Sequence, residues 1–407
     1  MEKYTIESTA SLKKIMNDYF HSLYTPGKKI AWCTSVGPAE LLRSFGFEVY
    51  FPENHGALLG ATRKAMDYIP EAVKCGYSGH ICSYTTADIG SYLKKESPLQ
   101  SHYGLQGIPT PDLIVYNTNQ CREVEDWFNF FAREFKCPIA GIHPPRHLDD
   151  VSDDVVALVV KQFKHIIPAC EKASGQRFDE DKFRETVRLS KEATLLWQKV
   201  LKTSAAAIAP ISFFDATIHM GPIVVLRGTE IAKNYYTLLL AELEAKLKNK
   251  VGFLPHAKTR IFWEGMPIWG KLRMLSDTFN ESNAAVVAST YCSSWVFDQF
   301  DEKDPWTSTA RAYTEIFINR SEDAKMKILM QWFELYKIDG IIYHDSKTCF
   351  NNSNAKFGMP QRLKEMSGIP SLVIEGDLCD MRFFSEGQSI TKIETFLEQL
   401  EDNKILS

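Results

Sequence analysis

The sequence predicts an α/β fold with two doubly wound parallel-sheet domains joined by a helical segment. Short apolar runs alternate with helical stretches at the start of the chain, long helical stretches fill the middle, and the alternation then resumes. Strands and helices that alternate at this spacing pair in parallel through right-handed crossovers, which is a Rossmann-like arrangement. We expect a first domain over 1–150, a helical bridge over 151–255 and a second domain over 256–407.

Length and composition exclude several classes of protein. The chain has 407 residues, of which 44% are hydrophobic and 24% charged, and its formal net charge is −4. It is too long for one ordinary domain and too apolar to be disordered. Since a general nucleic-acid binder normally carries a basic excess, we expect no nucleic-acid partner.

The sequence also predicts a cytoplasmic protein. No stretch reaches about 18 consecutive apolar residues, so no membrane span or membrane partner is expected. Residues 1–20 mix charged and apolar side chains and lack the apolar core and cleavage site of a signal peptide. In the cytoplasm thiols stay reduced.

In the first domain, helical periodicity and short apolar runs define the elements. Helices are expected over 7–23, 38–45 and 123–135, and strands over 29–32, 47–51, 111–116 and 137–142. Pro38 suits a helix start and Gly46 a helix end. The residues from Pro52 to Gly56 are expected in the loop after the second strand.

The bridge and the second domain follow the same reasoning. Helices are expected over 153–173, 181–201 and 222–248, then strands over 259–262, 284–288, 340–343 and 371–374, and a last helix over 388–400. Gly265 to Lys271 fits the G-x-x-x-x-G-K spacing of a phosphate loop, but Leu272 stands where Ser or Thr should hold magnesium. Pro267 also removes a backbone donor, so we expect a tight strand-to-helix turn here.

Cysteines gather where a ligand would bind. In parallel sheets ligands bind beyond the carboxyl ends of the strands. Six of the nine cysteines follow a predicted strand, and these are Cys33, Cys82, Cys121, Cys292, Cys349 and Cys379. Cys82 follows a weak strand candidate at 79–81. Cys75, Cys137 and Cys170 are expected in the core, where free cysteine behaves as a small hydrophobe.

The cysteine spacing restricts the chemistry. Nine cysteines at irregular spacings are no disulfide framework, and C-x-x-C and H-E-x-x-H motifs are absent. What remains is a cluster assembled from distant loops, such as an iron–sulfur cluster, or a set of inert buried thiols.

Several stretches are similar to one known family. They are TSVGPAE at 34–40 together with FPEN at 51–54, GYSGHICSY at 76–84, the stretch 109–121, which ends in NTNQC, DGIIYHDSKTC at 339–349, and the stretch 369–382, which contains EGD. Together they resemble the cluster-bearing subunits of the 2-hydroxyacyl-CoA dehydratase and benzoyl-CoA reductase family. The similarity covers nearly the whole length and keeps the order of the motifs.

The resemblance implies a cofactor and an activity. It implies one [4Fe-4S] cluster between the domains, held by Cys82, Cys121 and Cys349, with one iron open. The enzyme would be a 2-hydroxyacyl-CoA dehydratase (a lyase) or a benzoyl-CoA reductase (an oxidoreductase). It would add one electron to a CoA thioester to form a ketyl radical. A β-proton then becomes removable, or an aromatic ring becomes protonatable.

The resemblance further implies partners and residue roles. The partners would be a related second cluster-bearing subunit, an ATP-hydrolysing iron–sulfur activator and the acyl-CoA substrate. Glu53 would be the acid/base, Ser35 would hydrogen-bond the ligand at the open iron, and His55 would donate to the substrate. Their ordinary alternatives are a solvated or capping carboxylate, a helix cap and a structural histidine.

Two alternatives within the family stay open. One is a homodimeric reductase with a double-cubane [8Fe-9S] cluster, for which Cys33 and Cys292 fall near positions that would serve. The other is the electron-relay subunit of the heterodimer, which transfers electrons without binding substrate.

Overall fold

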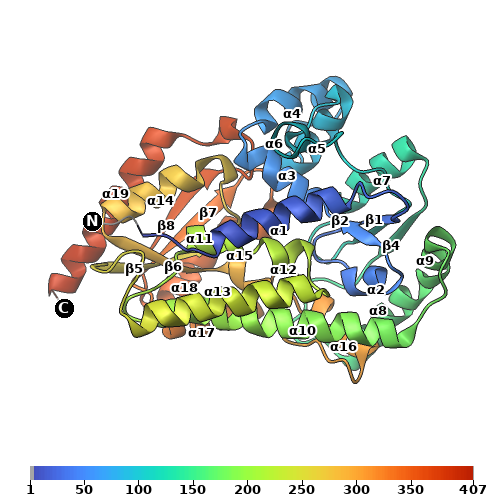
Figure 1. Cartoon of the computed structure of the whole chain (residues 1–407). Helices are drawn as coiled ribbons and strands as arrows, with labels where there is room; N and C mark the ends of the chain where they lie inside the picture. The colour runs from blue at the N-terminus through green and yellow to red at the C-terminus, as the bar shows by residue number, and fades with distance from the viewer. Residues whose placement is uncertain (1–3, 407) are drawn as a thin grey trace.

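Two parallel sheets frame the molecule, as the sequence predicted (Figure 1). The computed structural model describes residues 4–406. The first sheet has the order β2-β1-β3-β4 and the second the order β6-β5-β7-β8, each with four strands. The strands are β1 (Ile30–Cys33), β2 (Glu48–Tyr50), β3 (Leu113–Asn117), β4 (Ile139–Ile142), β5 (Thr259–Glu264), β6 (Ala284–Ser289), β7 (Gly340–Ser346) and β8 (Ser371–Gly376).

The two sheets share one topology. In each, the strand that comes first in the chain lies inside the sheet, between the second and the third strand. All pairs are parallel, with registers such as Ala31 to Leu113 and Ile261 to Gly340. The strand order therefore reverses between β1 and β3 and again between β5 and β7, and crevices at such reversals are the usual ligand sites of α/β sheets.

In the part of the chain that the structure describes, seven helices precede or separate the strands of the first sheet. They are α1 (Thr9–Ser22), α2 (Ala39–Ser44), α3 (Pro52–Ala61), α4 (Ala65–Lys74), α5 (Ser83–Lys94), α6 (Pro98–Tyr103) and α7 (Glu123–Phe135). The expected loop at 52–56 was wrong, because α3 begins at Pro52, and proline suits the first helical position. The weak strand candidate at 79–81 was wrong too, since these residues form a turn and a bend before α5.

The middle of the chain is helical, as predicted. It contains α8 (Asp153–His165), α9 (Ile167–Ser174), α10 (Glu180–Lys202), α11 (Phe213–His219), α12 (Gly221–Val225) and α13 (Glu230–Lys248). Two predicted helices are each divided. A new helix, α9, begins at Ile167 after α8 ends at His165, with Pro168 in its first turn. Gly228, with φ of +79°, separates α12 from α13.

The second sheet has its own helices. They are α14 (Leu272–Glu281), α15 (Thr290–Ser293), α16 (Pro305–Thr314), α17 (Glu322–Tyr336), α18 (Met359–Ser367) and α19 (Glu386–Leu406), besides short 3₁₀ turns. Gly265, with φ of +97°, makes the predicted tight turn between β5 and the 3₁₀ turn η2 (Trp269–Lys271).

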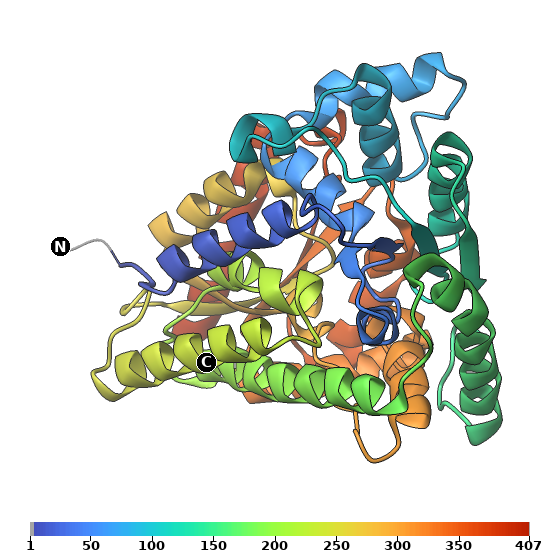
Figure 2. The same ribbon diagram turned by 45° about the vertical axis from the view of Figure 1, so that its right-hand side comes forward.

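The helical bridge is shared between the two halves of the molecule. The long helices α10 and α13 lie side by side in both views, and α1 runs across α12 and α13 (Figures 1 and 2). From the other end of the chain, α16 packs against α8. The boundaries at 150 and 255 therefore stay a prediction. No helix within residues 4–406 is long and apolar enough to cross a membrane.

Candidate functional site

A cavity of about 610 Å³ lies where the carboxyl ends of the two sheets meet. Its lining includes Ser35 after β1, Cys121 after β3, Gly265 after β5 and Cys349 after β7. These four strands are the ones at which the strand order reverses, so both crevices open into one cavity. The cavity is thus placed by the topology, and side chains from both halves of the chain reach it.

Three of the nine cysteines line this cavity, and they are Cys82, Cys121 and Cys349. All three are half-buried. Cys82 immediately precedes α5, Cys121 stands two residues before α7, and Cys349 immediately precedes the 3₁₀ turn η4 (Phe350–Asn352). The structure therefore brings together, from three separate loops, the three residues that were predicted as cluster ligands.

Each of the three thiols accepts a backbone N–H from the residue three positions further on. The donors are Thr85 for Cys82, Val124 for Cys121 and Asn352 for Cys349. Such bonds favour a thiolate, as does the start of a helix. They stabilise the charged form that binds iron.

Burial acts in the opposite direction. It raises the pKa of Cys121 and of Cys349 to about 12, and that of Cys82 well above its ordinary value. Negative charge on Cys349 and Cys121 raises the pKa of Cys82 further, and Cys121 does the same to Cys349. The three thiols therefore lie close enough to repel one another as thiolates, and a cationic group between them would relieve this repulsion.

The donor set fits an iron–sulfur cluster better than a single ion. Within residues 4–406, no three His, Cys, Asp or Glu side chains converge closely enough to hold one metal ion. A cluster with several irons takes thiolates that are spread around it. The three loops offer such a spread set of soft ligands.

Hydrogen bonds tie these loops to one another. The backbone N–H of Ser83 donates to the Thr348 hydroxyl at 3.0 Å, which joins the Cys82 loop to the Cys349 loop. Arg146 donates to the Gln120 carbonyl at 3.1 Å and to the Asn351 side chain at 2.8 Å. These bonds hold the three loops in register across the two sheets.

The other six cysteines do not line the cavity. Cys33 is fully buried, and Cys292 is buried with its sulfur 3.6 Å from the Thr217 hydroxyl. Cys379 is buried and donates to the Ser83 hydroxyl at 3.2 Å. Cys170 is buried as expected, whereas Cys75, expected in the core, is exposed at the end of α4 and Cys137 is half-buried.

Glu53 lies in the first turn of α3 and faces the cavity. The backbone N–H of Ser35 donates to its two carboxylate oxygens at 3.0 and 3.1 Å, and the Gln120 amide donates to one of them. Burial raises the pKa of Glu53 to about 7, although these hydrogen bonds oppose the shift. The carboxyl can therefore hold or release a proton near neutral pH. Sequence reasoning missed Gln120, for which adjacency to Cys121 was the only signal.

His55 lies two residues further along α3 but is not among the residues that line the cavity. Its Nδ1 is 2.5 Å from an Asp88 carboxylate oxygen and its Nε2 is 2.7 Å from the Ser97 hydroxyl. The Trp127 indole donates to the other Asp88 oxygen at 2.9 Å. With both ring nitrogens bonded inside the protein, His55 joins α3 to α5 and α6, and its contact with substrate stays a prediction.

Comparison with known proteins identifies the family. Residues 34–400 match the family model described as 2-hydroxyglutaryl-CoA dehydratase, D-component. The chain belongs to this family. It is 28% identical over 388 residues to the alpha subunit of lactoyl-CoA dehydratase from Anaerotignum propionicum, covering 93% of this chain and 92% of that protein. It is 28% identical over 381 residues to a benzoyl-CoA reductase subunit from Thauera aromatica, covering 90% and 87%.

Other members give the same result. The (R)-2-hydroxyisocaproyl-CoA dehydratase alpha subunit of Clostridioides difficile is 29% identical over 386 residues, covering 94% of this chain and 92% of that protein. The predicted resemblance to the dehydratase and reductase family is confirmed, because the relatives are dehydratase and reductase subunits. Their names as subunits indicate enzymes built from more than one chain.

Proposed function

We propose that this chain is the cluster-bearing, substrate-binding subunit of an acyl-CoA dehydratase or reductase that activates a CoA thioester by one electron. One observation carries the proposal. Three thiols suited to an iron–sulfur cluster and a carboxyl with a pKa of about 7 line the same cavity at the carboxyl ends of both sheets. A [4Fe-4S] cluster held by Cys82, Cys121 and Cys349 would supply the one-electron chemistry and a Lewis acid.

Residues of this chain would accept or donate the proton in the reaction. Glu53 would accept the proton that leaves the β-carbon of a thioester, or deliver one to a ring, because its pKa is near neutral pH. The Ser35 N–H and the Gln120 amide fix the direction of its carboxyl group. Ser35, which also lines the cavity, would direct its hydroxyl toward the ligand of the cluster.

The same geometry favours a catalytic subunit with one cluster over the electron-relay subunit and over the double-cubane reductase. An electron-relay subunit has no use for a carboxyl that titrates near pH 7 inside its cavity, whereas a catalytic subunit does. A double-cubane cluster needs additional thiolates, and Cys33 and Cys292 lie outside the cavity lining. The partners would be a related second subunit and an ATP-hydrolysing activator, in the cytoplasm.

Metal content after anaerobic purification is the first test. We expect about four irons and about four acid-labile sulfides per chain, and loss of most iron in Cys82→Ser, Cys121→Ser and Cys349→Ser. Cys33→Ser and Cys292→Ser serve as matched controls and should keep their iron. About eight irons per chain, or iron loss in the controls, would point to the double-cubane alternative. No iron in any form of the protein would overturn the proposal.

A second test separates the catalytic subunit from the relay. Glu53→Gln should lower turnover about 10²–10⁴-fold in the complex with its partner subunit and activator while iron content stays unchanged. If turnover stays at the wild-type rate with normal iron content, the chain is the relay subunit.

A further inference from the structure

We propose that the acyl group bound in this cavity is uncharged and apolar, and that acyl groups carrying a second carboxylate are rejected. The inference rests on the proposed function and adds the substrate class. It comes from the apolar side chains that line the same cavity as the three thiols and Glu53.

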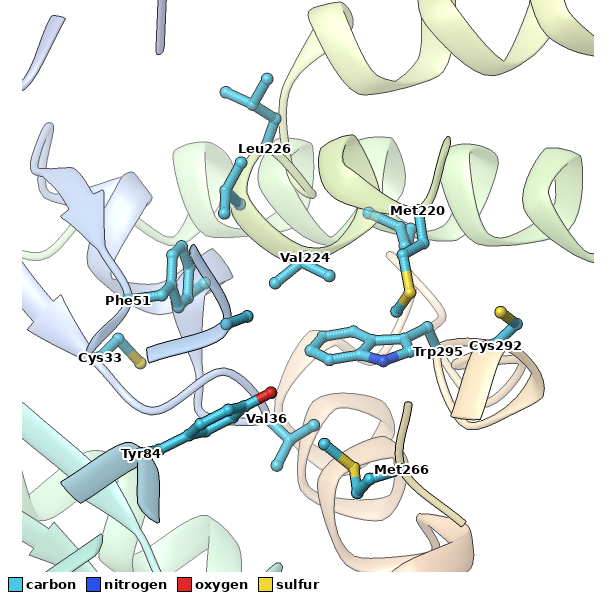
Figure 3. Close-up of a cluster of buried hydrophobic side chains, with 14 of the residues drawn as sticks. Cys33, Val36, Phe51, Tyr84, Met220, Val224, Leu226, Met266, Cys292 and Trp295 are labelled. Atoms are coloured by element: carbon cyan, nitrogen blue, oxygen red, sulfur yellow. The ribbon is translucent and has the colours of Figure 1, made fainter. Parts of the chain in front are cut away.

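This part of the lining is an apolar wall made of Met220, Val224, Met266 and Trp295. All four are buried, with exposed fractions between 2% and 9%. They come from separate elements, since Met220 and Val224 belong to the α11–α12 region, Met266 follows β5 and Trp295 follows α15. In Figure 3, Val224, Met220 and Met266 surround the Trp295 indole from three sides.

The wall contains no cation that would pair with a carboxylate. Among the described residues that line the cavity, the only ones able to carry positive charge are Lys13 on α1 and His102 on α6. Both are exposed, so they lie at the mouth of the cavity and not against the buried wall. The buried Arg227 points elsewhere, with its donors on Gly37, Val224 and Tyr313.

Apart from Lys13 and His102, the ionisable groups that line the cavity are acidic. Glu53 and Glu123 contribute carboxyl groups, and the three cysteines contribute negative charge when they are thiolates. Two tyrosines, Tyr84 and Tyr291, also line it, and each offers a phenol hydroxyl group. A neutral hydroxyl does not offset the charge of a second carboxylate.

Rejection follows from the cost of burying an unpaired charge. A carboxylate that leaves water for an apolar wall loses its solvation and gains no partner. Neighbouring negative groups add repulsion. Methionine and tryptophan side chains, in contrast, pack adaptably around aliphatic and aromatic groups. The cavity should therefore prefer an apolar acyl group over a carboxylate of the same shape by about 100-fold or more in affinity.

Two thioesters of matched shape test this preference. In 5-methylhexanoyl-CoA an isopropyl group stands where glutaryl-CoA has a carboxylate, and neither carries the 2-hydroxyl group that dehydration needs. We would measure their dissociation constants, and that of free CoA, by anaerobic calorimetry on the iron-loaded chain with its partner subunit. The expected result is that 5-methylhexanoyl-CoA binds about 100-fold more tightly than glutaryl-CoA.

The outcomes separate this inference from the proposed function. If glutaryl-CoA binds as tightly as 5-methylhexanoyl-CoA, the apolar substrate class is wrong while the acyl-CoA site stands. If neither thioester binds more tightly than free CoA, the proposed function fails and this inference fails with it.

A variant in the wall tests the residues themselves. Met220→Lys places a flexible cation of similar length in the wall and should improve glutaryl-CoA binding by about 10-fold or more, while weakening 5-methylhexanoyl-CoA. Met220→Leu is the matched control and should keep the wild-type preference. Unchanged selectivity in a Met220→Lys protein with normal iron content would overturn the assignment of this wall. If Met220→Lys fails to fold, the wild-type thioester pair decides alone.

Discussion

Arg227 and Glu40 form an ion pair in which neither side chain is exposed to solvent, with Nε 3.4 Å from Oε1. The Tyr313 hydroxyl joins the pair, since it accepts from Arg227 at 2.8 Å and donates to Glu40 at 2.6 Å. Arg227 also donates to the Gly37 carbonyl at 2.9 Å. This cluster links α2, the helical bridge and α16, and it supports the loop that carries Ser35.

Breaking this pair should destabilise the whole chain. Arg227→Met would leave the buried Glu40 carboxylate without its cation, and we expect a loss of about 3–5 kcal/mol in the free energy of unfolding. Chemical denaturation of the purified chain measures it. The control is Arg273→Met, because Arg273 is 87% exposed and its ion pair should contribute less than about 1 kcal/mol. Equal losses in the two variants would contradict the role of the buried cluster.

The pH dependence of turnover should reflect the ionisation of the Glu53 carboxyl group. If its carboxylate accepts the proton, the rate should rise as pH increases through about 7, because ionisation of Glu53 has its midpoint there. Steady-state rates measured between about pH 5.5 and 8.5 would show this rise in rate. Glu53→Gln should remove the rise and lower the rate about 10²–10⁴-fold. A variant that keeps the wild-type pH profile would assign the titration to another group.

Much of this site was predictable because it lies at the ends of strands. Cys121 and Cys349 follow apolar runs that are typical of buried strands, and topology places all such ends together. The helix that begins at Pro52 was missed, because a short apolar stretch next to a strand has no clear period of its own. Contacts between segments that follow different strands, such as that between Gln120 and Glu53, depend on packing that one sequence does not encode locally.

The buried carboxyl group of Glu264 should make the free energy of unfolding depend on pH. It is buried at the end of β5, accepts from Asn354 at 2.7 Å on one oxygen, and its other oxygen has no hydrogen-bond partner. Burial raises the pKa of Glu264 to about 7. Because the folded chain then binds a proton that the unfolded chain releases above pH 4.5, this residue lowers stability progressively between about pH 4.5 and 7.

Replacement of Glu264 isolates that contribution. Glu264→Gln should match the wild type near pH 4.5, and should exceed it at about pH 8 by up to about 3 kcal/mol in the free energy of unfolding. Denaturation curves at the two pH values measure the difference. Glu365→Gln, at an exposed position, is the control and should show no such dependence on pH. A difference that is the same at both pH values would exclude titration of Glu264.

Arg146 should tune the reduction potential of the proposed cluster. It bridges the loops of Cys121 and Cys349 through Gln120 and Asn351, and its charge opposes the burial-driven rise in the pKa of Cys121. The Arg146 Nε is buried without a partner, so the guanidinium charge is only partly compensated inside the protein. Positive charge beside a cluster stabilises the reduced form, and net charge is one of the factors that set cluster potentials.

Arg146→Met should therefore lower the midpoint potential by an amount on the order of tens of millivolts. Redox titration followed by electron paramagnetic resonance measures the potential independently of turnover. Arg146→Lys keeps the charge but not the paired donors, so its potential should stay nearer to the wild type. If Arg146 had only a structural role, both variants would lose iron, but the clusters that remain would keep the wild-type potential. An unchanged midpoint potential in Arg146→Met would therefore refute the electrostatic role. A potential that rises instead would mean that the loss of loop contacts outweighs the loss of charge.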